Sequence, residues 1–390
     1  MIRSLAAILA AALLVAVATP SVRAAEPYEI NVIMPLTGSA AFLGKAENQS
    51  LQLIEVVVNK TGGIKGRPVK FVVQDDQSSP QVAVQLANAV IAKKVPVILG
   101  SSVVAMCNAI AALVKNGPVQ YCFSPGIHPP QGSYTFSASV STKDLIAVYL
   151  TYFRSMGWTK VALLFSTDGS GQDAERSFDE ELKLPENKAV QIVAREHFNT
   201  TDVSVAAQIS HIKAADPQVV VAWTTGTPFA TVLRAYNESG MTAPLATTNG
   251  NMTYAQMAQY APYLPKTLLF PGLSFFGFEN VAKGPVRDAQ KVFYDAFAAI
   301  NVKPDAANSF DWDPIMIVID ALRAKGTDAT AAQVRDYIAN LHDYAGIDGI
   351  YDFRDAVQRG LTRSNALVTR WDAAKGTWVA ISKPGGAPLR

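Results

Sequence analysis

The chain has 390 residues, of which 49% are hydrophobic and 17% charged, and its 34 Lys and Arg nearly balance its 32 Asp and Glu. This balance excludes a protein that holds nucleic acid through excess basic charge, and the hydrophobic content excludes a disordered chain. Two Cys and four His leave too few ligands for a typical zinc or iron–sulfur site, so we expect no metal and no cofactor. The length predicts two or three units with their own cores.

The first 24 residues have the pattern of a secretory signal peptide. Arg3 precedes an apolar run over 5–17, and Val22 and Ala24 occupy the −3 and −1 positions of a cleavage site after Ala24 or Ala25. A membrane anchor is the alternative, but the run is about 13 residues long, short of the roughly 20 that span a bilayer. We therefore expect export to the periplasm and a soluble mature chain.

Export also bears on Cys107 and Cys122. In an oxidising compartment a cysteine pair usually forms a disulfide. A bridge closing a loop on the order of 15 residues would contribute roughly 3 kcal/mol. Two buried thiols are the alternative, because the sequence does not show how far apart the two Cα atoms lie.

Short apolar strands alternate with amphipathic helices along most of the chain. We expect strands over 29–34, 69–74, 95–99, 119–123, 161–165, 190–198 and 219–223. We expect helices over 46–60, 80–93, 105–115, 145–156, 174–182, 205–214, 228–239 and 286–300. This alternation predicts an α/β fold with parallel sheets covered by helices on both faces.

The pattern extends to about a dozen strands, more than one open sheet usually holds. Two sheets in two lobes are the simpler arrangement, with crossings near 136–141 and 269–276. Ligands of such sheets lie outside the carboxyl ends of the strands, next to helix N-termini. We therefore expect a small molecule to bind between the lobes and a hinge to close over it.

No catalytic or cofactor motif is apparent, and we expect no enzyme. Ser170 lacks the Gly-x-Ser-x-Gly spacing of a nucleophile elbow, because Asp168 stands where the first glycine should be. A turn before the helix at 174 is the better interpretation of that segment. Neither a Gly-x-Gly-x-x-Gly fingerprint after the first strand nor a phosphate-binding Gly-Lys-Ser/Thr is present.

Several motifs occur in a characteristic order. They are Met34-Pro35-Leu36-Thr37-Gly38, Gly62-Gly63-Ile64-Lys65-Gly66-Arg67, Asp75-Asp76, Ser124-Pro125-Gly126, Asp168 with Gly171, and Gly349-Ile350-Tyr351-Asp352-Phe353. This order resembles the leucine/isoleucine/valine-binding protein family, the type I periplasmic solute-binding proteins of ABC importers. The resemblance implies a monomer that captures a small solute and delivers it to a membrane permease with its ATPase.

The resemblance also implies two Rossmann-like lobes joined by a three-segment hinge, with the third crossing near 363–367. After the signal peptide (1–24), the first lobe would comprise 26–138 with 275–363. The second lobe would comprise 139–274 with 364–390. A ligand-sensing regulatory subunit of the same fold is the second hypothesis, and a hydrolase using Ser170 is the third.

The positions that bind the ligand carboxylate in amino-acid-binding relatives differ here. Those relatives supply hydroxyls from the loop after the fourth strand, where this chain has Val103 and Val104, with Met106 nearby. Ser102 lies earlier and is expected to reach the ligand less well. An anion can still bind the free amides at the start of the helix at Ala105.

Two further departures concern the solute itself. The family commonly places Tyr before Gly171, and Ser170 leaves more room there. Asn249 stands where amino-acid binders carry an acid for the ligand ammonium, and an amide cannot neutralise a buried cation. We therefore favour an aromatic or other organic acid. An amide or urea-like solute, bound by Asn249, Asn251 and Thr225, ranks second, and a branched-chain amino acid third.

The other candidate contacts are aromatic side chains or lie at strand ends. Phe42 and Leu43, on the loop after the first strand, are the stronger wall candidates, although aromatic side chains are often simply buried in a core. Ser124, at the end of the fifth strand, is either a ligand contact or a cap. The remaining candidates are Pro125, Gly126, Thr227, Phe276 and Trp312.

Overall fold

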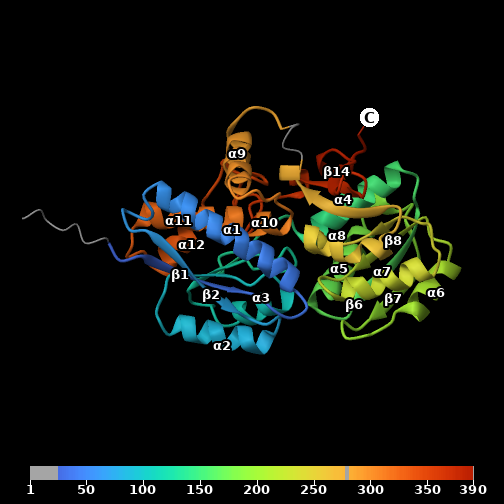
Figure 1. Cartoon of the computed structure of the whole chain (residues 1–390), viewed down its shortest axis with the longest axis horizontal. Helices are drawn as coiled ribbons and strands as arrows, with labels where there is room; N and C mark the ends of the chain where they lie inside the picture. The colour runs from blue at the N-terminus through green and yellow to red at the C-terminus, as the bar shows by residue number, and fades with distance from the viewer. Residues whose placement is uncertain (1–24, 277–280, 390) are drawn as a thin grey trace, which may run out of the picture.

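The computed structural model describes residues 25–276 and 281–389, so the predicted signal peptide lies outside the described residues. Two sheets organise the chain, each at the centre of one lobe (Figure 1). The first sheet is parallel and contains β1 (Tyr28–Met34), β2 (Val69–Asp75), β3 (Val97–Gly100), β4 (Val119–Cys122) and β5 (Thr135–Ser137). Its order is β2-β1-β3-β4-β5.

The second sheet is parallel in its centre and antiparallel at one edge. It contains β6 (Lys160–Ser166), β7 (Gln191–Phe198), β8 (Val219–Trp223), β9 (Leu245–Ala246), β10 (Leu268–Leu273), β13 (Ala366–Asp372) and β14 (Thr377–Ala380). The order is β14-β13-β10-β9-β8-β6-β7, with β13 antiparallel to both of its neighbours. The predicted fold class is confirmed.

Helices cover the faces of both sheets, as the sequence pattern predicts. The first lobe carries α1 (Ala41–Lys60), α2 (Pro80–Ile91), α3 (Val104–Ala111), α9 (Pro285–Ala298), α10 (Ala307–Phe310), α11 (Trp312–Lys325), α12 (Ala331–Ala339) and the hairpin β11 (Tyr344–Gly346) and β12 (Gly349–Tyr351). The second lobe carries α4 (Thr142–Ser155), α5 (Gly169–Glu181), α6 (Ala206–Ala214), α7 (Pro228–Glu238) and α8 (Tyr254–Tyr260). None of the helices within the described ranges is long and apolar enough to cross a membrane.

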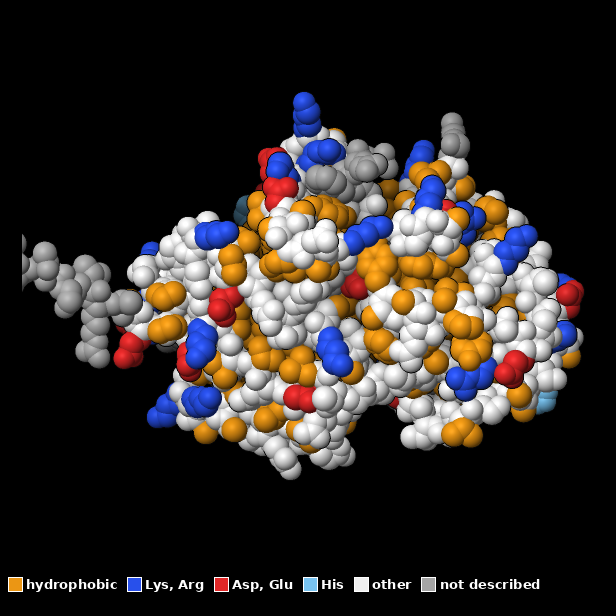
Figure 2. All heavy atoms as spheres, in the orientation of Figure 1, with side chains coloured by type: hydrophobic (Ala, Val, Ile, Leu, Met, Phe, Trp, Pro, Cys, Tyr) orange, Lys and Arg blue, Asp and Glu red, His pale blue; other side chains and the backbone are white. Residues whose placement is uncertain are grey.

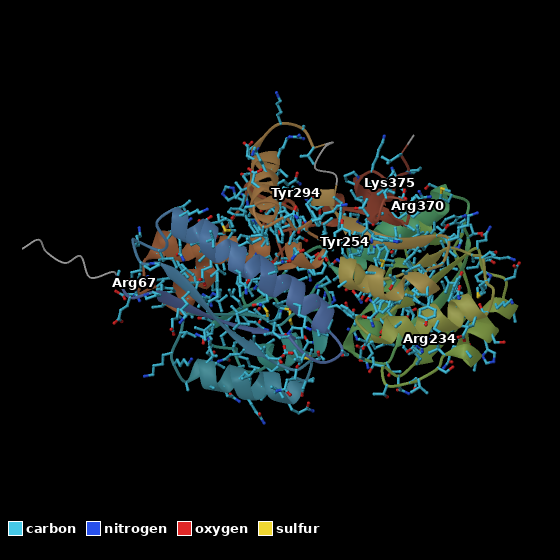
Figure 3. All side chains as sticks on the ribbon, viewed as in Figure 1. Arg67, Arg234, Tyr254, Tyr294, Arg370 and Lys375 are labelled. Carbon is cyan, nitrogen blue, oxygen red and sulfur yellow. A yellow bond between two sulfur atoms is a disulfide. The ribbon has the colours of Figure 1, made fainter. Side chains whose placement is uncertain are left out.

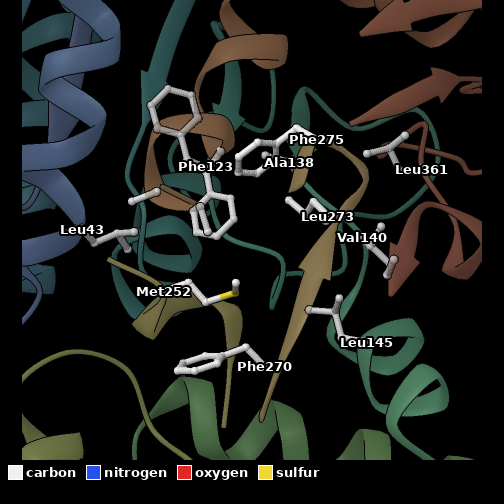
Figure 4. Packing of buried hydrophobic residues seen from close by; sticks show 14 of the residues in the cluster. Leu43, Phe123, Ala138, Val140, Leu145, Met252, Phe270, Leu273, Phe275 and Leu361 are labelled. Atoms are coloured by element: carbon white, nitrogen blue, oxygen red, sulfur yellow. The ribbon is translucent and has the colours of Figure 1, made fainter. Parts of the chain in front are cut away.

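The chain passes between the lobes three times, after β5, after β10 and before β13. Buried hydrophobic side chains from both lobes pack into one cluster around these crossings (Figure 4), among them Phe123, Met252 and Phe270. The hinge is therefore packed rather than a flexible tether. The exact lobe boundaries remain a prediction.

The structure corrects several local expectations. Helix α1 begins at Ala41 rather than at residue 46, so Phe42 and Leu43 lie on its first turn and not on a loop. Helix α5 begins at Gly169, which makes the predicted turn around Ser170 the first turn of a helix. The loop before α3 follows the third strand, and Ser124 follows the fourth, each one strand earlier than expected.

The predicted disulfide is confirmed. Cys107 on α3 and Cys122 at the end of β4 are bridged, with their Cα atoms 5.8 Å apart and 15 residues of sequence separation. Both residues are fully buried. The bridge therefore fixes α3 against the sheet.

Candidate functional site

A cavity lies between the lobes, where the carboxyl ends of β3 and β4 face those of β6, β8 and β9. Its volume is about 20 Å³, close to the space that one water molecule needs. Among the residues that the structure describes, no charged side chain lines it. The predicted site residues on its wall are Leu43, Ser102, Val104, Ser124, Pro125, Gly126, Ser170, Thr225 and Asn249. Ser102, the candidate expected to reach the ligand less well, lies on the wall with the others.

Other lining residues were not predicted as contacts. They are Val103, Thr142, Trp223, Thr248, Gly250 and Phe310. Thr142 and Thr248 could have been predicted as cavity residues, because each stands next to a strand end or a helix start, where ligands of parallel sheets bind. Trp223 ends an apolar strand and Phe310 lies in a short helix, so both look like ordinary core residues in the sequence.

Several predicted candidates lie away from this cavity. Trp312 packs edge-on against Phe293, with ring centroids 4.9 Å apart, and Phe276 lies 4.1 Å from the ring of Phe275. Both are therefore core or hinge residues rather than walls of the cavity. Met106 is buried in a separate hydrophobic cluster behind α3.

Four more candidates are also off the cavity wall. Ala105 and Gly171 lie in the first turns of α3 and α5 but do not line the cavity. Phe42 and Thr227 line a neighbouring groove instead.

Two helix N-termini meet at the cavity, one from each lobe. A Cβ atom placed on Gly169 of α5 would lie 3.2 Å from Val104 and 3.6 Å from the amide nitrogen of Ala105 on α3. In α5 the first turn is capped, since Asp168 accepts the Gly171 N–H at 3.1 Å. In α3 no side chain caps the first turn. Its free N–H groups and positive dipole end therefore favour an anion.

Asn249 presents a buried donor without a partner. Its side chain is 1% exposed, and its Oδ1 accepts a hydrogen bond from Thr248 at 3.2 Å. The Nδ2 group has no partner among the described residues. A buried N–H left unpaired is costly, so this donor is available to an acceptor in the cavity.

Asn251, two residues later, has a structural role. Its Nδ2 donates to the Thr224 carbonyl at 2.7 Å, and its Oδ1 accepts the Gly226 N–H at 2.9 Å. Hydroxyl groups fill much of the remaining polar wall, with the Ser170 and Thr225 hydroxyl oxygens, both from the second lobe, 3.4 Å apart. The wall therefore offers neutral groups and backbone amides.

Glu47 lies behind Ser102 and is completely buried. Its Oε2 is hydrogen-bonded to the Ser102 hydroxyl, and its Oε1 has no partner among the described residues. Burial raises the pKa of Glu47 to about 8, with Asp76 and Asp305 contributing in the same direction. Burial and the neighbouring Glu47 raise the pKa of Asp311 as well. The Glu47 carboxyl group is therefore mostly neutral at pH 7.

Comparison with known proteins gives the family. A family model described as "Periplasmic binding protein" matches residues 27–377. The chain belongs to this family. As a periplasmic binding protein it is an extracytoplasmic ligand-binding receptor and not an enzyme.

Solved structures share the fold. An extracellular ligand-binding receptor from Rhodopseudomonas palustris has a TM-score of 0.81 at 19% identity, covering 92% of this chain and 100% of that one. A branched-chain amino acid binding protein of Streptococcus pneumoniae in complex with isoleucine has a TM-score of 0.74 at 21% identity, covering 91% and 98%. An R. palustris solute-binding protein in complex with benzoate has a TM-score of 0.74 at 17% identity, covering 93% and 97%.

A sequence relative matches over a short segment. Leu/Ile/Val-binding protein homolog 3 of Brucella melitensis is 35% identical over 71 residues, which is 18% of this chain. The match spans 19% of the length of that relative.

Within the described ranges of this periplasmic binding protein, no group of three His, Cys, Asp or Glu is placed to hold a metal ion.

The buried Glu47 should make the stability of this periplasmic binding protein depend on pH. Its folded pKa of about 8 lies above the usual 4.5. Between these values the folded state keeps a proton that the unfolded state releases, so the free energy of unfolding falls as pH rises. Glu47→Gln should remove this contribution. We expect the variant to gain more than about 1 kcal/mol relative to wild type between pH 5 and pH 8.

Urea denaturation at the two pH values measures this gain. Glu29→Gln is the matched control, because Glu29 is exposed on β1, and its difference from wild type should be the same at both values. An equal response of the two variants to pH would contradict the assignment of a buried, neutral Glu47.

Proposed function

We propose that this periplasmic binding protein captures a small organic acid, above all an aromatic carboxylate, in the central cavity and presents it to an ABC importer. The observation that carries the proposal is the unpaired Nδ2 of buried Asn249 opposite the uncapped start of α3. Both supply hydrogen-bond donors, and a carboxylate supplies only acceptors.

The same wall is a poor site for an amino acid. Within the described part of the chain no carboxylate lines the cavity, so a ligand ammonium would stay buried without a counter-charge, which is costly. Glu47 is separated from the cavity by Ser102, and its raised pKa keeps it mostly protonated. The benzoate complex of a structural neighbour and the isoleucine complex of another show that this fold accommodates both ligand classes. The choice between these two ligand classes therefore depends on the residues that line the cavity.

Capture requires movement of the lobes. A cavity of about 20 Å³ is too small for any organic acid, so the hinge must open for the solute to enter, and the side chains of the wall must rearrange around it when the lobes close again. In the proposed cycle the protein is exported by its signal peptide. It acts as a monomer and then docks on the permease, which is coupled to an ATPase.

An amide or urea-like solute is the second candidate, because Thr225, Thr248 and Asn249 offer neutral donors and acceptors. A thermal-shift screen of ligand-free protein distinguishes the classes. A solute present at 100 times its dissociation constant should add about 2.7 kcal/mol to the free energy of unfolding. Shifts with aromatic acids but not with amides or amino acids support the proposal, and shifts confined to amino acids would refute it.

Asn249→Asp tests the role of this residue directly. A new carboxylate on the wall should repel an anionic solute and weaken its binding about tenfold or more. Amino acids should lose less affinity or gain it, because the wall then carries a counter-charge for an ammonium. Asn237→Asp adds the same charge on the exposed face of α7 and serves as the control. Calorimetric titration of both variants measures the difference, and equal affinities for the acid would argue against the proposed contact.

A further inference from the structure

A second, larger hollow lies beside the central cavity on the face shown in Figure 2. This groove has a volume of about 560 Å³, far more than the central cavity. Its walls come from the first turns of α1, from residues 253–255 at the start of α8, and from Val302, Lys303, Asp305 and Asn308 before and in α10. Both lobes therefore contribute. Hydrophobic side chains with basic side chains beside them are visible at this junction (Figure 2).

Two ammonium groups border the groove. Lys45 lies on α1 and Lys303 on the turn before α10, and both side chains are exposed. Within the described part of the chain, no carboxylate lies within 4.0 Å of either ammonium. The Lys303 Nζ lies 5.2 Å from the ring centroid of Tyr254, and burial lowers the pKa of Lys303. The groove thus has two cations without a direct acidic partner.

Among the described residues that line the groove, Asp305 is the one carboxylate, and its oxygens already accept hydrogen bonds. Asp305 is buried, and its oxygens accept the N–H groups of Tyr254 at 3.0 Å and Ala307 at 3.1 Å. Burial also raises the pKa of Asp305 to about 7, so part of the population is neutral. Asp305 therefore compensates the two lysines poorly, and the groove favours an added negative charge.

Ring surfaces complete the groove. Phe42 on α1 and Tyr254 on α8 are both half-buried and line it from opposite lobes. Figure 3 shows Tyr254 at the junction of the two lobes. The flat apolar surfaces of these two rings lie in the same groove as the ammonium groups of Lys45 and Lys303. This combination fits a ligand with a planar ring that carries an acid group.

We propose that this groove is a second site that binds a small aromatic carboxylate, with the ring against Phe42 and Tyr254 and the carboxylate at Lys45 and Lys303. The site does not depend on which solute the central cavity holds. Because its walls belong to both lobes, an occupant bridges them. Binding therefore stabilises the closed arrangement of the lobes in preference to an open one.

Calorimetric titration of the exported protein with benzoate tests the proposal. We expect binding in the millimolar range or tighter, reduced about tenfold in the Lys45→Ala/Lys303→Ala double variant. The matched control is Lys375→Ala/Lys383→Ala, which removes two exposed lysines of the second lobe and should bind like wild type. Acetate, which has the charge but no ring, should bind more weakly than benzoate.

The outcomes separate this site from the central cavity. Benzoate binding that survives Asn249→Asp but is lost in Lys45→Ala/Lys303→Ala supports the groove even if the central cavity holds another solute. Unchanged binding in Lys45→Ala/Lys303→Ala overturns the proposal. So does the absence of benzoate binding to the wild type, or equal binding of acetate and benzoate.

Discussion

Replacing Gly226 by Ala should weaken solute binding by about two orders of magnitude, equivalent to about 2.7 kcal/mol, while leaving the fold intact. Gly226 lies in the second lobe, between β8 and α7, and the following Thr227 donates its N–H to the Ser39 carbonyl of the first lobe at 3.0 Å. A Cβ atom on Gly226 would lie 2.2 Å from that carbonyl oxygen. The two backbones can therefore meet only when residue 226 has no side chain. Since the closed lobes enclose the solute, separating them removes part of its binding site.

Backbone strain is the competing explanation, because Gly226 has φ +86°, which disfavours any L side chain. Gly240→Ala is the matched control. Gly240 is in the same lobe with φ +68°, but a Cβ atom there would have nothing within 4 Å. We expect both variants to lose similar stability in thermal unfolding and only Gly226→Ala to lose affinity for the acid that gives the largest shift in the screen. Similar affinities in the two variants would contradict the steric argument.

The alternation of strands and helices was predictable because each element carries its own hydrophobic period. The first residues of two helices were not predictable in this way. α1 and α5 each have glycine in their first turns, which lowers helix propensity and suggests a turn. The structure supplies the missing reason. A Cβ atom on Gly44 would lie 2.2 Å from the Pro35 carbonyl oxygen, and one on Gly171 would lie 1.8 Å from that of Ser166. Tertiary packing therefore requires glycine at these two positions, and local helix propensity does not reveal that requirement.

The candidate site was predictable to the extent that it follows topology. Residues directly after strands, such as Ser124 and Thr225, lie on the cavity wall because parallel strands bring their carboxyl ends to one edge. Trp223, which ends an apolar strand, and Phe310, which lies in a short helix, were missed. The reverse error affected Trp312, an aromatic that seemed suited to a wall and is packed in a core. Hydrophobic pattern alone does not distinguish a wall from a core.

Replacing Arg359 by Met should lower the free energy of unfolding by about 3 kcal/mol or more. Arg359 is 7% exposed and lies shortly before the third crossing. Its guanidinium donates to the carbonyls of Ile127 at 2.7 Å, Ala138 at 3.0 Å and Ser139 at 3.2 Å. It therefore ties one hinge segment to the backbone of the first crossing. Methionine fills a similar volume but leaves these three buried carbonyls without a donor.

The nearby Arg363 provides the control, because its side chain is half-exposed and forms an ion pair with Asp144 at 3.4 Å. An exposed ion pair contributes little, so Arg363→Met should cost less than about 1 kcal/mol. Urea denaturation of both variants measures the difference, with Arg359→Lys expected to fall between them because a point-like ammonium satisfies fewer of the carbonyls. A loss of stability in Arg359→Met no larger than that in Arg363→Met would show that the carbonyls find other partners and that the hinge does not depend on this guanidinium.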